Sequence, residues 1–215
     1  MAPLVQPLSP VFPEPGLYSS AAWDGLKVGL LGGSFNPAHE GHRHISKLAI
    51  QYLGLDCIWW MVSPQNPLKP SEGMAALQKR MAFARSVANH PRIVVTDIEI
   101  KLGTQYTADT LDALRARYGQ TAFVWLMGAD NLHQIHQWQR WRDIFSFTPV
   151  AVFNRPPMIQ AITSAPAANY YRDAMIPPGK AHRLIGIQPP VWTLFHTPLN
   201  PQSATALRHN GKGLD

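Results

Sequence analysis

Two adjacent glycines and three histidines lie close together in the stretch GLLGGSFNPAHEGHRHISKLA, which spans residues 29–49. A glycine pair lets the backbone approach a ligand closely. A histidine ring can donate a hydrogen bond to a ligand or bind a metal ion directly. Two kinds of chemistry therefore suit this stretch, the binding of a metal ion and the binding of a phosphate group.

The spacing of the histidines disfavours a metal site. A zinc-protease helix has the spacing H-E-x-x-H, whereas the residue four positions after His39 is Arg43. His39 and His42 could share a metal ion, but no nearby cysteine or carboxylate obviously completes a set of ligands. We therefore expect no metal ion to be held by these histidines.

The same residues suit a phosphate-binding loop. Two glycines end the apolar run KVGLLGG, which predicts a buried strand, and a helix is expected from about Gly41. The amino end of a helix offers N–H groups and a partial positive charge, so it binds phosphate readily. His39 and His42 would lie at the mouth of this loop and could donate hydrogen bonds to phosphate oxygens. The stretch matches neither the Walker pattern nor G-x-G-x-x-G, so the usual nucleotide motifs do not describe it.

The rest of the chain alternates apolar runs with segments of helical periodicity. This alternation predicts an α/β fold in which a Rossmann-like parallel sheet is flanked by helices in a single domain. In such a sheet, ligands bind at the carboxyl ends of the strands. The expected strands are 27–33, 57–62, 92–100, 121–128, 149–156 and 191–197, and helices are expected from about 41, 74 and 107, in one or two short segments up to about 145, and over 203–210.

The composition limits the classes of protein to which the chain can belong. Its 215 residues, 46% of them hydrophobic, suit one domain over 26–215, preceded by a proline-rich arm over 1–25 that we expect to be extended or loosely packed. No apolar run is long enough to span a membrane, and the start has no basic segment of the kind found in signal peptides. The single cysteine, Cys57, requires no oxidising compartment. We therefore expect a cytoplasmic protein with no membrane contact.

The charge indicates an anionic partner. The formal net charge is +6, but the lysines and arginines are scattered and form no dense basic run. A phosphate-bearing small molecule explains this charge as well as RNA does, and we expect no nucleic-acid partner.

Four stretches together resemble the nicotinate-nucleotide adenylyltransferase family, part of the nucleotidyltransferase superfamily with the H-x-G-H motif. GGSFNPAHEGH resembles the superfamily signature G-G-[ST]-F-[DN]-P-x-H-x-G-H. QYTADTL is similar to S-Y-T-x-x-T-L, WLMGADNLHQIHQWQRW to G-x-D-S/N-L…W, and SATALR to I-S-[SA]-T-x-[IL]-R. The motifs occur in family order between Lys27 and Arg208. Asn36, Gln105 and Gln202 depart from the usual Asp, Ser and Ile.

The resemblance implies a Rossmann-like fold and a reaction of NAD biosynthesis. ATP and nicotinate mononucleotide would give nicotinate adenine dinucleotide and pyrophosphate, with Mg²⁺ entering with ATP and keeping several of its waters. By resemblance, His42 would contact the α-phosphate, His39 would bind beside it, and Arg208 would hold the β- or γ-phosphate. The other groups implied at the ATP phosphates are the backbone of Gly33, Ser34 and Phe35 and the side chains of Ser203 and Thr205.

The resemblance also implies a site for the mononucleotide. Trp138 would stack on the nicotinate ring, and the backbone N–H groups of Tyr106 and Thr107 would bind its carboxylate. Asp130, which follows Gly128, would accept hydrogen bonds from ribose hydroxyls. Lys69 is a weaker candidate for the mononucleotide phosphate, because an exposed lysine in a proline-rich loop is commonly only solvated.

Several alternatives remain open on the sequence alone. Ser203 and Thr205 suit ordinary helix caps as well as phosphate ligands. Trp138 and Trp141, three residues apart, could instead both form an edge of the core, and for Trp141 we expect that position. The acceptor could instead be nicotinamide mononucleotide or phosphopantetheine. Because fold does not determine function, a non-catalytic nucleotide- or RNA-binding module is a further alternative. The sequence predicts no particular oligomeric state.

Overall fold

Apolar runs form the strands of a sheet that is covered on both faces. The run CIWWMV, for example, is buried at all six of its positions. The computed structural model describes residues 10–64, 74–154 and 164–196. The strands are β1 (Lys27–Gly33), β2 (Cys57–Val62), β3 (Ile93–Thr96), β4 (Ala122–Gly128), β5 (Val150–Asn154), β6 (Met175–Ile176) and β7 (Trp192–His196).

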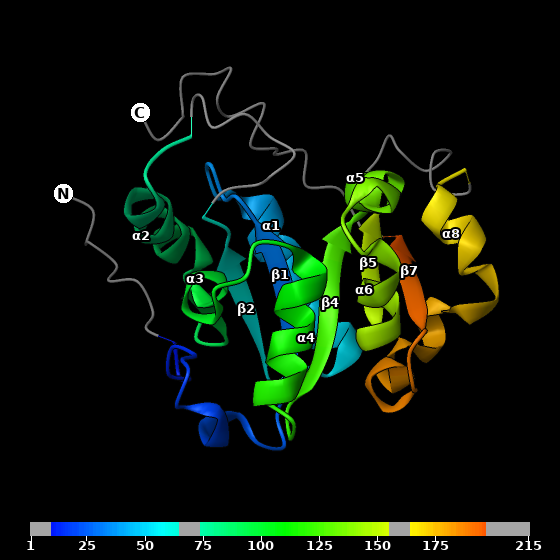
Figure 1. Cartoon of the computed structure of the whole chain (residues 1–215), viewed down its shortest axis with the longest axis horizontal. Coiled ribbons are helices and arrows are strands. Elements are labelled where there is room, and N and C mark those ends of the chain that lie inside the picture. Colours follow the sequence, from blue (N-terminus) through cyan, green and yellow to red (C-terminus); the bar gives the residue numbers. More distant parts are fainter. Residues whose placement is uncertain (1–9, 65–73, 155–163, 197–215) are drawn as a thin grey trace.

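The seven strands are parallel and lie in the order β3-β2-β1-β4-β5-β7-β6 (Figure 1). After β1, the chain adds β2 and β3 on one side of the sheet. It then returns to place β4 on the other side of β1, and β5, β7 and β6 lie beyond β4. The crevice at such a switch in strand order, at the carboxyl ends of the strands, is where open α/β sheets bind ligands. The predicted fold class is confirmed.

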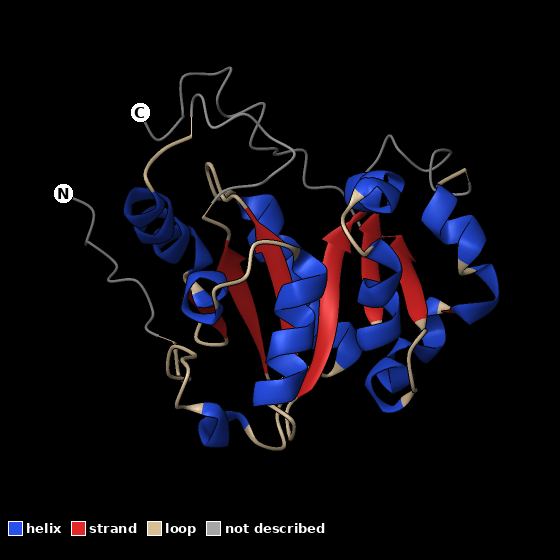
Figure 2. Cartoon of the chain, in the orientation of Figure 1, coloured by secondary structure: helices blue, strands red, loops and turns tan. Residues whose placement is uncertain are grey.

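Helices cover the two faces of the sheet and form a separate apolar cluster with each (Figure 2). One face is covered by α1 (Glu40–Leu53), α2 (Leu77–Ala88) and the 3-10 segment η4 (Pro178–Gly186). The other is covered by α3 (Ile98–Leu102), α4 (Thr107–Arg117), α5 (Ala129–Gln134), α6 (Trp141–Phe147) and α8 (Pro166–Tyr170). The shorter 3-10 segments are η1 (Ser20–Trp23), η2 (Ile135–Gln137) and η3 (Arg172–Ala174). In the described part of the chain, no helix is long and apolar enough to cross a membrane.

The strand expected over 92–100 is half wrong. It ends at Thr96, and residues 98–102 form α3 instead. The alternation that suggested a strand is not matched by burial, since Glu99 is buried and Ile100 is 46% exposed. Gly103 ends the helix in the left-handed conformation (φ 67°), and its N–H donates to carbonyls of the last turn, which is a common way for a helix to end.

Two other parts of the chain differ from expectation or lie outside the description. The sequence predicted no definite element between Pro156 and Pro190, yet the described part of this stretch forms α8, η3, β6 and η4. The terminal helix expected over 203–210 lies outside the described residues.

The N-terminal arm contacts the body of the protein at several points where the structure describes it. Trp23 is completely buried and meets Trp59 edge to face, with ring centroids 4.7 Å apart. The carboxylate of Glu14 pairs with Lys101 at 2.7 Å, and the hydroxyl of Tyr118 donates to the carbonyl of Gly16 at 2.8 Å. Trp23, Glu14 and Gly16 therefore anchor the described part of the arm to the body of the protein, although Val11 and Tyr18 are 73% and 97% exposed. The domain boundary after residue 25 stays a prediction.

Candidate active site

The loop between β1 and α1 holds two histidines in a reciprocal arrangement. His39 is the N-cap residue of α1, and its Nδ1 accepts a hydrogen bond from the N–H of Gly41 at 3.1 Å. The N–H of His39 in turn donates to Nδ1 of His42 at 3.2 Å. Because each Nδ1 accepts a hydrogen bond, each neutral ring carries its proton on Nε2. Both histidines therefore have a defined tautomer whose Nε2–H is a donor.

Aromatic side chains hold the ring of His42 in place. Its centroid lies 4.7 Å from that of Phe35 and 5.8 Å from that of Trp60. The indole N–H of Trp60 donates to the hydroxyl of Ser46 at 2.8 Å, and this hydroxyl donates to the carbonyl of His42 at 2.9 Å. Phe35 is itself only 2% exposed. Its side chain therefore supports the site, and only its backbone could contact a ligand.

The two glycines at the end of β1 serve different purposes. A Cβ on Gly32 would lie 2.6 Å from the ring of Trp125, so the packing of the sheet requires a glycine there. A Cβ on Gly33 would lie 3.6 Å from the ring of Phe35, an ordinary contact. The sequence reasoning gave both glycines a role in ligand approach, and for Gly32 the structure supplies a packing reason instead.

The side chain of Arg80 joins this loop to the loop that follows β2. Arg80 is only 1% exposed, and its Nη1 donates to the carbonyls of Ser34 at 2.6 Å and Ser63 at 2.7 Å. The sequence reasoning missed this residue. Its position held a signal, because an arginine three residues after Leu77 and four before Ala84 lies on the apolar face of the predicted helix.

Residues of β4 and α5 lie across the switch point from the histidine loop. The pairing of Leu31 with Leu126 places Gly33 and Gly128, two residues further along each strand, at the same level of the sheet. Asp130 follows in the first turn of α5 and is exposed. Its carboxylate is therefore on the same edge as the histidine loop, where a ligand could reach it.

The structure brings Tyr106 and Thr107 to the amino end of α4. Tyr106 is the N-cap residue and Thr107 the first residue of this helix. The first N–H groups of a helix have no partner within it. The hydroxyl of Thr110 bonds to the carbonyl of Tyr106 and to the hydroxyl of Thr104, which fixes the preceding turn.

An ion pair joins α4 to the turn that holds Trp138. Nη1 of Arg140 lies 2.7 Å from the carboxylate of Asp109 in the first turn of α4, and its Nε lies 2.7 Å from that of Asp143. Trp138 is half-buried, ends η2 and packs partly on the core. Arg140 thus ties the turn that follows Trp138 to the first turn of α4. Sequence patterns gave no sign of this contact between residues 31 positions apart.

Trp141 belongs to the core edge, as expected. Its ring packs edge to face against those of Phe145, Tyr170 and Tyr171. Trp138 takes part in none of the ring pairs found among the described residues. Of the two tryptophans, Trp138 is therefore the one suited to stack on a ligand.

Comparison with known proteins places the chain in a family. Residues 30–210 match the cytidylyltransferase-like family model. The chain is 51% identical over 187 residues to a protein of Parvibaculum lavamentivorans named probable nicotinate-nucleotide adenylyltransferase, covering 87% of this chain and 93% of the relative. Relatives of the same name from Roseobacter denitrificans and Rhizobium meliloti are 51% and 45% identical, each over 87% of this chain and over 94% and 100% of their own lengths. The chain belongs to the nicotinate-nucleotide adenylyltransferase family.

Solved structures show the same fold at low sequence identity. Plasmodium falciparum nicotinic acid mononucleotide adenylyltransferase complexed with NaAD superposes with a TM-score of 0.61 at 14% identity. The match covers 86% of this chain and 83% of that chain. At this identity the likeness shows the fold alone, and the fold agrees with membership of the nicotinate-nucleotide adenylyltransferase family.

Four of the residues suggested by resemblance to the nicotinate-nucleotide adenylyltransferases lie outside the described residues. They are Lys69, Ser203, Thr205 and Arg208. Their roles stay predictions. The other candidates belong to the loop between β1 and α1, to the amino end of α4 and to the segment from α5 to η2. The β1–α1 loop, the start of α4 and α5 lie at the same end of the sheet (Figure 1).

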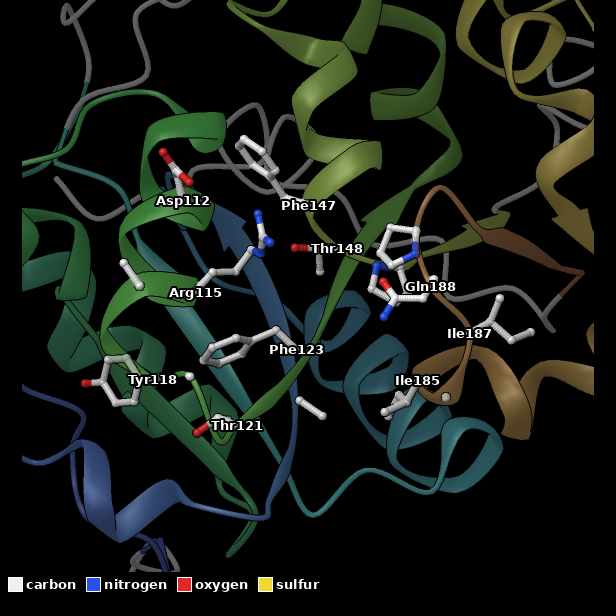
Figure 3. Close-up of a pocket in the computed structure, with 16 residues that line it drawn as sticks. Asp112, Arg115, Tyr118, Thr121, Phe123, Phe147, Thr148, Ile185, Ile187 and Gln188 are labelled. Carbon is white, nitrogen blue, oxygen red and sulfur yellow. The ribbon is translucent and has the colours of Figure 1, made fainter.

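A groove of about 530 Å³ lies at the amino ends of the strands, whereas the candidate active-site residues lie at the carboxyl ends (Figure 3). It is bordered by Ala122, where β4 begins, and by Pro149, which precedes β5. The charged residues that line it, Asp112 and Arg115, are both exposed. The groove is thus at the amino ends of the strands and is no part of the candidate active site.

Proposed function

We propose that the chain joins nicotinate mononucleotide to ATP, forming nicotinate adenine dinucleotide and pyrophosphate. The observation that carries this proposal is the pair of histidines, His39 and His42, each fixed as an Nε2–H donor at the amino end of α1 and at the switch point of the sheet. Family membership supports the choice of substrates, since the relatives are named for this reaction.

The chemistry requires positioning and charge stabilisation. An oxygen of the mononucleotide's 5′-phosphate attacks the α-phosphorus of ATP, a new P–O bond forms, the bond from the α-phosphorus to the bridging oxygen breaks, and pyrophosphate leaves. A phosphate is already an anion at neutral pH, so no strong general base is needed. Preorganised donors around the α-phosphate would then supply most of the catalysis.

The histidine loop would provide those donors. Nε2–H of His42 would donate to an oxygen of the α-phosphate, where charge develops, and Nε2–H of His39 would donate to a neighbouring phosphate oxygen. The backbone N–H groups of Gly33, Ser34 and Phe35 and the amino end of α1 would add to the positive field. A further set, Ser203, Thr205 and Arg208, would hold the β- and γ-phosphates.

The acceptor would bind between α4, α5 and the turn that holds Trp138. The N–H groups of Tyr106 and Thr107 would bind the nicotinate carboxylate. An amide in its place would present N–H groups of its own to these donors, which favours nicotinate over nicotinamide. Trp138 would stack on the pyridine ring, and Asp130, next to the strand end at Gly128, would accept from ribose hydroxyls. Lys69 would bind the mononucleotide phosphate.

Mg²⁺ would arrive bound to ATP. Among the described residues no group of three or more His, Cys, Asp or Glu side chains could hold a metal ion. This donor set fits an ion that is held by phosphate oxygens and water, because the site's own groups are N–H donors that would contact the phosphates. Mg²⁺ supplies neutralisation of the triphosphate charge. The proposed partners are therefore ATP, nicotinate mononucleotide and pyrophosphate. The proposed location is the cytoplasm, as the sequence predicts.

Pyrophosphate release tests this function. The purified protein is given ATP and Mg²⁺ with nicotinate mononucleotide, nicotinamide mononucleotide or phosphopantetheine at matched concentrations. Fast release with the first alone is the expected result. Release only with another acceptor would keep the phosphate loop and discard the acceptor site around Tyr106, Thr107 and Trp138, whereas no release with any acceptor would favour a non-catalytic nucleotide-binding protein.

A further inference from the structure

The guanidinium of Arg80 is surrounded by backbone carbonyl groups. Besides the bonds from Nη1 to Ser34 and Ser63, its Nη2 donates to the carbonyl of Pro64 at 2.9 Å and its Nε to that of Ala75 at 2.9 Å. All three of its nitrogens are therefore engaged, in the plane that the guanidinium imposes. This planar set of donors holds four carbonyls in fixed relative positions.

These carbonyls belong to three segments near the carboxyl ends of the strands, where the candidate active site also lies. Ser34 is the first residue after β1, Ser63 and Pro64 follow β2, and Ala75 precedes α2. The N–H of Ser63 also donates to the carbonyl of Gly33 at 2.9 Å, and the side-chain oxygen of Asn36 accepts from the N–H of Ala75 at 3.3 Å. Arg80 thus ties the phosphate loop to the segment that follows β2 and to the segment that precedes α2.

The positive charge of Arg80 has no acidic partner within residues 10–64, 74–154 and 164–196. Burial lowers the pKa of this guanidinium, but arginine starts so high that it stays charged at neutral pH. Carbonyl dipoles stabilise the charge without cancelling it. A charge in a poorly hydrated place interacts over longer distances than one in water, so it contributes a positive potential to the phosphate loop.

We propose that Arg80 is a positioning residue for nucleotidyl transfer, which holds the loop of Ser34 and Phe35 in the geometry that receives the triphosphate. This inference rests on the proposed function for its reaction, and on the four hydrogen bonds for its mechanism. The chemical feature required is the planar fork of donors. A lysine keeps the charge, but its three N–H donors all radiate from one nitrogen, so it cannot reach four carbonyls that are spread around the guanidinium of Arg80.

Two substitutions separate the planar set of donors from the positive charge, and a third provides a matched control. R80K keeps the charge and loses the planar donors, whereas R80Q loses both the charge and the planar donors. Arg92 makes the same kind of contact at the opposite edge of the sheet, where it donates to the carbonyls of Leu55 and Asp56. R92K therefore removes guanidinium-to-carbonyl bonds of the same type, away from the candidate active site.

Steady-state kinetics with ATP and nicotinate mononucleotide provide the first measurement. We expect R80K to lower kcat by about 10- to 100-fold, the size of effect that follows small displacements of reacting groups, with the KM for the mononucleotide changed less than about threefold. R80Q should in addition weaken binding of ATP with Mg²⁺ by roughly tenfold more than R80K, because the charge is gone. R92K should keep kcat within about threefold of the wild type.

Amide hydrogen exchange provides a measurement that does not depend on turnover. R80K should speed exchange in peptides that cover residues 33–36 and 63–64, and R92K should leave these peptides unchanged. Equal loss of kcat in R80K and R92K, or unchanged exchange around Ser34, would overturn the proposal. Loss of the folded circular-dichroism spectrum in both Arg80 variants would also overturn it, in favour of a purely structural role.

Failure of the proposed function would have a different signature. In that case the wild type releases no pyrophosphate with any acceptor. The positioning role is then decided by the exchange pattern and by the affinity for ATP with Mg²⁺, which R80K should weaken several-fold relative to R92K. An R80K protein that binds ATP as tightly as R92K would refute the inference, whatever the acceptor.

Discussion

The backbone N–H of His39 donates a hydrogen bond to the ring of His42 across the first turn of α1. The two rings lie with their centroids 3.8 Å apart. His42 is therefore both the third-position partner in the capping box of α1, whose N-cap residue is His39, and the proposed catalytic donor. A change in His42 has two separable consequences, one on the stability of the helix and one on the chemistry.

His42→Ala should lower kcat by about 100- to 1000-fold, the usual effect of removing one donor that stabilises charge in a transition state. Loss of the hydrogen bond that the ring accepts from the N–H of His39 should cost about 1 kcal/mol of unfolding free energy. Pyrophosphate release and urea unfolding measure the two effects. His44→Ala, two residues further along α1, serves as the control and should keep most of the activity. A His42→Ala protein with nearly normal turnover would show that the proposed role is wrong.

Trp138→Ala should weaken binding of the acceptor while leaving that of ATP nearly unchanged. Stacking of a base on an aromatic ring contributes about 1 to 3 kcal/mol, so the KM for nicotinate mononucleotide should rise roughly tenfold or more. Initial rates with each substrate varied in turn measure the two constants. If only the KM for ATP rises, the two substrate sites have been assigned the wrong way round.

Asp109→Asn should have a smaller effect of the same kind. It breaks the ion pair through which Arg140 holds the Trp138 turn beside the amino end of α4. Exposed ion pairs contribute little to stability, so the melting temperature should hardly change while the KM for the mononucleotide rises about threefold. Arg85→Gln breaks another exposed pair, with Glu14, and should leave this KM as it is. Equal KM values in the two variants would show that the pair does not order the acceptor site.

The strands were predictable from the sequence because both faces of the sheet are buried. Residues 28–31 (VGLL) and 57–62 (CIWWMV) are short, continuously apolar runs, and their length and the glycines or turns that follow them favour buried strands over helices. The helix over residues 98–102 could not be predicted, because a five-residue helix has too few turns to show a helical periodicity in the sequence. The segments between 164 and 190 are held by packing and by pairing with β7, which local sequence does not encode.

The candidate site divides along the same line. The histidine loop could be predicted, because its spacing follows directly from a strand, a turn and a helix that are adjacent in sequence. Arg80 and the pair of Asp109 with Arg140 could not, since each joins segments that meet only in the folded chain. Periodicity revealed that Arg80 lies on an apolar face but not which groups it would contact there.

Glu99→Gln should change how stability depends on pH. Burial raises the pKa of the Glu99 carboxyl to about 7, although a hydrogen bond with Ser63 opposes this shift. Because the folded pKa lies above the unfolded one, the folded state holds the proton more tightly, and stability falls as the pH rises from about 4.5 through 7. The full cost, up to about 3 kcal/mol above pH 7, follows from the size of this shift.

Urea unfolding of wild type and Glu99→Gln at pH 5 and pH 8 measures this effect. The two proteins should be similar in stability at pH 5, where Glu99 is neutral, and Glu99→Gln should be the more stable at pH 8. Asp112→Asn removes an exposed carboxyl and serves as the control for the change in net charge. Parallel pH dependence in wild type and Glu99→Gln would show that Glu99 does not retain its proton in the folded state.

Cys57 should be inert toward thiol reagents in the native protein. The side chain is completely buried at the start of β2, and burial, helped by the neighbouring charge of Asp56, raises the pKa of its thiol to about 12. Only the thiolate reacts, so at pH 8 a pKa of that size leaves roughly one thiol in ten thousand ionised. Labelling with an aromatic disulfide reagent should be complete within minutes in denaturant, and in the native state it should proceed only as fast as the protein opens. Rapid native labelling that quickens with pH would mean that the thiol is accessible and that the packing around β2 is looser than the structure shows.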